Sequence, residues 1–198
     1  MYEVLKVKIV GVAPLIMHNI QLADPANRFV REIKRITNKK KQMTEADHIE
    51  KNRLEFLGGL YMGENGPILP ADMIEGVIIS GAKKSSKGPQ AKAGIVVEKH
   101  ADVIYDGTRD PNELFADDDH RLTRMARVGQ SKVTRTRPIF NSWAANLEVK
   151  YLPEIINRED IMEALRNGGM LCAVGDWRPR YGRFEVIAEI QQALPVAA

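Results

Sequence analysis

The stretch from Gly168 to Phe184 gathers residue types suited to binding a phosphate and a flat ring. It holds four glycines and three arginines within one connection. Glycine lets the backbone approach a ligand closely, guanidinium groups pair with phosphates, and aromatic rings stack on bases. A tight connection whose tryptophan caps the core is the alternative. The candidate nucleic-acid contacts are Trp177, Arg178, Arg180 and Arg183.

A second concentration of charge lies at residues 121–137, where six basic residues occur without one acidic residue. The first three are spaced by three, which would place them near one another on a helical turn. Residues 133–140 alternate in part, so an extended arm is the other possibility. Contacts to several phosphates would make binding strongly salt-dependent. The alternative is an arm that is solvated or pairs with the acidic run 117–119. The candidates are Arg121, Arg124, Arg127, Lys132, Arg135 and Arg137, with Lys83 and Lys84 from a lysine-rich loop at 83–92 as an extension.

Catalytic signals are weaker. His18 has no evident partner, and Asp24 followed by Pro25 is typical of a helix cap. The four histidines are scattered and the sequence has no paired-cysteine motif, so no metal site and no cofactor are predicted. No phosphate-binding loop, nucleophile elbow or dinucleotide fingerprint occurs.

The bulk composition indicates a soluble protein with a substantial core. The chain has 198 residues, of which 44% are hydrophobic, and a net charge of +3. Cys172 is the only cysteine, which excludes an intramolecular disulfide and favours the cytoplasm. We expect no signal peptide and no membrane span.

Hydrophobic periodicity predicts the elements that position these residues. Strands are expected at 3–10, 95–105, 147–151 and 183–190, with one helix opening at Pro70 and another running from Asn157 to a stop at Gly168 and Gly169. Gly76 and Gly81 in the first of these helices indicate close packing. The order β-α-β-β-α-β predicts an α+β, ferredoxin-like fold, the topology of RNA recognition motifs.

The whole chain, 1–198, is interpreted as one such domain with two insertions. Residues 19–69 form a helical insertion after the first strand, with helices beginning near Asp24 and at Thr44. Residues 106–138 form a thumb-like basic arm between the second and third strands. The outer face of the sheet carries Lys and Glu of mixed sign without an aromatic pair, so the insertions and loops, rather than the sheet, are expected to hold any nucleic acid.

With these elements in place, the chain resembles the RAMP superfamily, the repeat-associated proteins of CRISPR effector complexes. The likeness rests on Ala13 to Ile16 at the end of the first strand, Leu69 to Gly76 at the start of the first core helix, and the glycine-rich residues 175–184. The two insertions lie where the backbone subunits of those complexes carry theirs. A compact relative encoded by a phage or mobile element is equally compatible with this resemblance.

The resemblance implies a non-catalytic protein that binds single-stranded RNA or DNA, with RNA as the expected ligand, and assembles along the strand as a homo-oligomer or ribonucleoprotein. Some relatives cleave RNA with an Asp or His in the loop after the first strand, so an endoribonuclease using His18 or Asp24 is the first alternative. A structural protein, for example one in phage assembly, whose insertions bind other proteins is the second.

Overall fold

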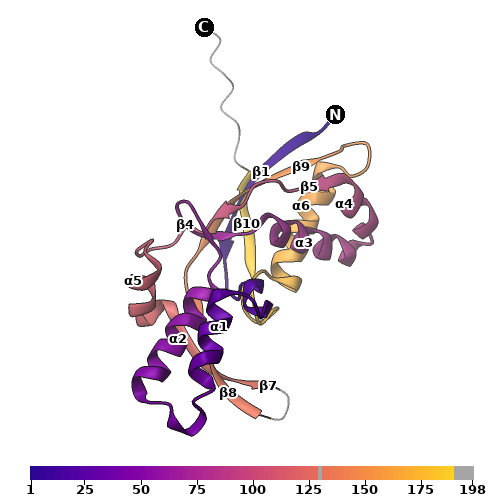
Figure 1. Ribbon diagram of the computed structural model, residues 1–198. Coiled ribbons are helices and arrows are strands. Elements are labelled where there is room, and N and C mark those ends of the chain that lie inside the picture. The colour runs from indigo at the N-terminus through magenta and orange to yellow at the C-terminus, as the bar shows by residue number, and fades with distance from the viewer. Residues whose placement is uncertain (129–130, 190–198) are drawn as a thin grey trace.

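The computed structural model describes residues 1–128 and 131–189, which form a mixed α/β arrangement with several antiparallel sheets (Figure 1). The central sheet has four strands in the order β10-β1-β9-β5. Their bounds are Phe184–Glu189, Glu3–Gly11, Ala144–Tyr151 and Ile95–Val96. All three pairings are antiparallel, with Leu5 opposite Val149 and Lys8 opposite Ala188.

Alternation along β1 divides the central sheet into an inner and an outer face. Leu5, Val7 and Ile9 are buried, as predicted. On the outer face Lys6 Nζ lies 3.6 Å from Glu148 Oε2, and Glu148 also forms an ion pair with Lys99. Charges on this face therefore neutralise one another instead of forming a basic surface.

Helices cover the inner face and pack closely on one another (Figure 1). Their bounds are Ala71–Ala82 for α3, Gly88–Gly94 for α4 and Arg158–Asn167 for α6, with η3 at Lys83–Ser85 and η5 at Gly168–Cys172. A Cβ on Gly81 would lie 1.9 Å from the carbonyl oxygen of Ala164, so glycine is required where α3 meets α6. The side chain of Asn157 caps α6 through the amide of Asp160, as predicted.

The first insertion forms a helical hairpin that extends from one end of the sheet (Figure 1). Thr44 and Asp47 make a capping box at the start of α2, which confirms the predicted start of that helix. The bounds are β2 Leu15–Ile16, η1 Ile20–Ala23, α1 Arg28–Thr37, η2 Lys40–Gln42 and α2 Glu45–Gly59, followed by a short hairpin of β3 Met62–Gly63 and β4 Gly66–Leu69.

The second insertion ends in a β-hairpin that lies beside α2 (Figure 1). Its strands β7 and β8 pair antiparallel, with Arg124 opposite Arg135, and β8 also pairs with β2. The bounds are β6 Ala101–Asp102, α5 Pro111–Ala116, η4 Asp118–His120, β7 Arg121–Val128 and β8 Ser131–Phe140. The extended arm is therefore the correct alternative for residues 133–140.

Several local predictions are wrong. The helical turn expected at 121–127 is the strand β7, because its residues pair one after another with β8 and this pairing outweighs the helical spacing of the three arginines. The strand expected over 95–105 ends at Val96, because residues 101–102 turn away to pair with β4. The expected loop 83–92 contains η3 and most of α4.

Three expected caps and contacts also differ. Asn27, not Asp24, caps α1 through the amide of Phe29, whereas Asp24 accepts from the amide of Ala26. The two glycines after α6 do not end the helical path, which continues as the wider turn of η5. Gly76 faces open space, since a Cβ there would meet nothing within 4 Å. Residue 190, the last of the predicted final strand, lies outside the described residues.

None of the helices in the described ranges has the length and apolar composition that crossing a bilayer requires.

Candidate functional site

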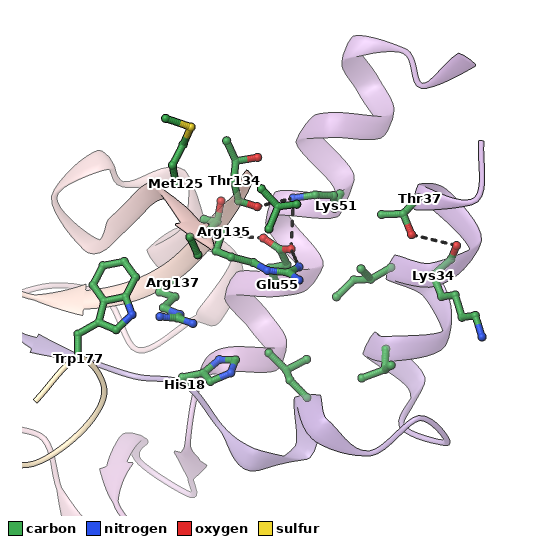
Figure 2. A pocket seen from close by; sticks show the side chains of 16 residues that line it. His18, Lys34, Thr37, Lys51, Glu55, Met125, Thr134, Arg135, Arg137 and Trp177 are labelled. Atoms are coloured by element: carbon green, nitrogen blue, oxygen red, sulfur yellow. Dashed lines mark hydrogen bonds and ion pairs between the residues drawn. The ribbon is translucent and has the colours of Figure 1, made fainter. Parts of the chain in front are cut away.

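A groove of about 870 Å³ runs between the helical hairpin α1–α2 and the β-hairpin β7–β8, and ends at Trp177 (Figure 2). Val30 and Ile33 of α1 and Met125 and Val133 of the β-hairpin give it apolar walls. Its cationic side chains come from three elements: Lys34, Lys51, Arg135 and Arg137. The groove thus brings together charge from α1, α2 and β8 that is dispersed in the sequence.

Glu55 of α2 connects the two sides of the groove. Its carboxylate accepts a hydrogen bond from Arg135 Nη1 at 2.6 Å and from the backbone amide of Thr136 at 3.0 Å. Lys51 Nζ lies 3.2 Å from the same carboxylate and also donates to the carbonyl of Thr134. Because Glu55 and Lys51 are both buried, this cluster fixes β8 against α2 and sets the width of the groove (Figure 2).

Arg137 occupies the end of the groove beside Trp177 and His18 (Figure 2). Its guanidinium carbon lies 4.7 Å from the centre of the Trp177 ring, within cation–π range. Its Nη1 also lies 2.5 Å from Asp176 Oδ2 in an ion pair. Partial burial lowers the pKa of Arg137, and the charge of Asp176 opposes this shift.

His18 lines the groove with its ring partly exposed. Partial burial, reinforced by the positive charge of Arg137, lowers the pKa of His18 below its ordinary value. The imidazole is therefore neutral at neutral pH, able to donate from one nitrogen and accept on the other. Asp24 does not line the groove, so the two weak catalytic candidates are not brought together there.

The glycine-rich connection holds Trp177 in an unusual backbone conformation. Trp177 has a φ of 54°, in the left-handed region that bulky residues rarely adopt. The amide of Asp176 donates to the carbonyl of Ile16, and the amide of Gly182 donates to the carbonyl of Pro14. The connection is thus tethered on both sides to the segment after β1, and it presents a half-buried Trp177 ring to the groove. Trp143, by contrast, is 3% exposed and belongs to the core.

The other arginines of this connection lie elsewhere. Arg178 and Arg180 are exposed, and Arg180 lies over the Tyr181 ring. The backbone carbonyl of Arg183 accepts hydrogen bonds from the amides of Val12 and Ala13. The side-chain Nε of Arg183 is buried and has no hydrogen-bond acceptor in the described part of the chain. Only Trp177 of the predicted group lines the groove.

The basic arm is divided in a similar way. Arg121 is occupied at the base of the β-hairpin, where it donates to the carbonyl of Phe115 and pairs with Asp118. Arg124 and Lys132 are exposed and outside the groove, as are Lys83 and Lys84 near the end of α3. Arg127 lies on β7, but its side chain falls outside the described residues.

Lys34, Lys51 and Glu55 are site residues that the sequence interpretation missed. They lie on α1 and α2, where charged residues are ordinarily solvated. A usable signal was the pair Lys51 and Glu55, whose i,i+4 spacing places both on one side of α2, flanked by the buried Leu54 and Phe56.

A scan against protein-family models gives no match for this chain, and a search among curated proteins gives none either. Across residues 1–128 and 131–189, no group of three or more His, Cys, Asp or Glu side chains could hold a metal ion.

Proposed function

We propose that the groove binds single-stranded nucleic acid without cleaving it. The observation that carries the proposal is the position of Arg137 and Trp177 side by side at the end of a concave, cation-lined surface. Guanidinium and ammonium groups neutralise phosphates, whereas an aromatic ring stacks on a base. A single strand offers both groups at once, because its bases are not occupied in pairing.

The balance of charge in the groove favours an anionic ligand. Four cationic side chains line the groove, whereas Glu55 is its one lining carboxylate and Asp176 pairs with Arg137 from outside it. Lys34 is exposed at the α1 side, and Arg135 is held at the β8 side by Glu55. The cations therefore lie on both walls, where they can contact successive phosphates of one strand.

We also propose that the central sheet with α3 and α6 is a ferredoxin-like core and that the chain is RAMP-like. The order β10-β1-β9-β5 corresponds to strands four, one, three and two of that topology, with β5 shortened to two residues. On this basis the ligand is RNA, the protein is cytoplasmic, and copies of it assemble along the strand, as the backbone subunits of CRISPR complexes do. The groove supports this proposal because both of its sides come from the two insertions.

The test is fluorescence anisotropy with a labelled uridine strand of about 16 nucleotides, from about 50 to about 200 mM salt. Lys34→Gln and Arg137→Gln should each weaken binding and reduce the salt slope by about 0.7. Lys84→Gln is the matched control, because it removes the same charge outside the groove. Salt-independent or absent binding by the unaltered protein would overturn the proposal and favour a structural, protein-binding role.

A neutral His18 in the groove supports one second candidate, an RNA-cleaving activity with His18 as general base. Cleavage of labelled RNA that is lost in His18→Ala would support this activity. Intact RNA after incubation with the unaltered protein would exclude it.

A further inference from the structure

A side pocket of about 520 Å³ lies next to the groove. It is lined by His18, Tyr61, Asp72, Ser80, Asp176 and Arg178, among others. His18 also lines the groove, and Asp176 is followed directly by Trp177, which lines the groove as well. The two cavities are therefore neighbours on either side of the segment that carries the proposed stacking ring.

One face of α3 forms a wall of the side pocket. Asp72, Gly76 and Ser80 follow one another at intervals of one helical turn, and all three line it. A Cβ at Gly76 would meet nothing within 4 Å, so the pocket is deepened by the missing side chain. The Ser80 hydroxyl donates to the carbonyl of Gly76 at 2.7 Å, which leaves its oxygen able to accept.

The polarity of the side pocket differs from that of the groove. Asp72 and Asp176 supply two carboxylates and Arg178 supplies one guanidinium group, and both Asp72 and Arg178 are exposed. Asp176 is engaged by Arg137, but Asp72 has no hydrogen bond or ion pair to its side chain within residues 1–128 and 131–189. Carboxylates repel a phosphate, so an occupant from a nucleic-acid strand must present an uncharged group with N–H donors.

We infer that the side pocket receives one nucleobase of the strand bound in the groove, and that Asp72 selects a base that presents an amino group to it, guanine, cytosine or adenine, over uracil. This inference rests on the proposed function. The phosphates stay outside near Arg178 and Arg137, while the base enters past Trp177. Tyr61 and Met73, which also line the pocket, provide surface for the faces of the base, and carboxylates accept hydrogen bonds from base amino groups.

The experiment compares uridine strands of about 16 nucleotides that carry one central guanosine, inosine, cytidine or adenosine. Guanosine, cytidine or adenosine should tighten binding by about fivefold or more over the all-uridine strand, the lower range of one base contact. Inosine, which lacks the 2-amino group, should lose most of the gain seen with guanosine. Equal binding of all strands would overturn the inference while leaving the proposed function intact, and no binding of any strand would refute the proposed function itself.

Two variants, each with its own control, distinguish base binding in the side pocket from a general effect of charge. Asp72→Asn should abolish the base preference, whereas Glu163→Gln, which removes an exposed carboxylate of α6, should leave it unchanged. Gly76→Leu should fill the pocket and remove the preference without loss of the all-uridine affinity, and Gly76→Ala is its control for helix propensity. A preference that survives both Asp72→Asn and Gly76→Leu would refute the assignment. Loss of the preference on adding spermidine while all-uridine binding persists would show instead a cation pocket, which also refutes it.

Discussion

Replacing Glu55 by glutamine should destabilise the protein more than any other single charge removal on α2. The substitution keeps the size of the side chain but removes the negative charge that Arg135 and Lys51 share. The glutamine would also offer only one acceptor oxygen in place of two, although the buried amide of Thr136 still needs an acceptor. Removing one partner of a buried ion pair strands the other partner's charge in a poorly solvated site.

The magnitude follows from the exposure of each partner. Breaking a buried ion pair typically costs about 3–5 kcal/mol. The Lys51 side chain is 10% exposed, so its charge would be left without a partner in a site that water hardly reaches. The Arg135 side chain is 37% exposed, so water can solvate its charge. We therefore expect a loss of about 3 kcal/mol in the free energy of unfolding, at the lower end of that range.

Urea denaturation followed by circular dichroism measures this loss. With an m-value of about 2 kcal/mol per molar, the urea midpoint should fall by about 1.5 M. Glu50→Gln is the matched control on the same helix, because its pair with Arg53 is 44% exposed at Glu50 and should contribute less than about 1 kcal/mol. Adding Lys51→Met to Glu55→Gln should recover part of the stability. If Glu55→Gln costs no more than Glu50→Gln, the cluster does not hold β8 against α2.

Three further changes test the structure. Trp177→Ala should weaken strand binding by about 1–3 kcal/mol in anisotropy titrations, and unaltered affinity would place the base elsewhere. The same change should lower the urea midpoint less than Glu55→Gln does, because the ring is only half-buried. Gly81→Ala should destabilise by more than about 2 kcal/mol, since its Cβ would collide with the carbonyl of Ala164, whereas Gly76→Ala should stabilise by up to about 1 kcal/mol; thermal melts with equal or reversed shifts would contradict this pair. Burial, with the nearby Glu3 carboxylate, raises the pKa of Tyr151 from 10.0 to about 12. The folded state therefore keeps the Tyr151 proton after the unfolded state has lost it, so the free energy of unfolding should fall between pH 10 and about 12. Over this range the urea midpoint of Tyr151→Phe should fall less steeply than that of the unaltered protein.

Local sequence signals determined the elements that are regular and locally capped. Alternation fixed β1 and its buried face, because the side-chain period of a strand is two. Thr44 and Asn157 marked the starts of α2 and α6, because a cap depends only on residues within one turn. Pro70 likewise marked the start of α3.

Only the tertiary structure decided which charged residues share a site. Arg121 and Arg135 look equivalent in the sequence, yet Arg121 is used at the base of the β-hairpin and Arg135 faces α2. Residues 121–128 became a strand because pairing with β8 outweighed the helical spacing of three arginines. Lys51 and Glu55 belong to the groove because α2 packs against β8, a contact between segments about eighty residues apart. Such long-range packing is set by the burial of whole faces, and no local spacing records it.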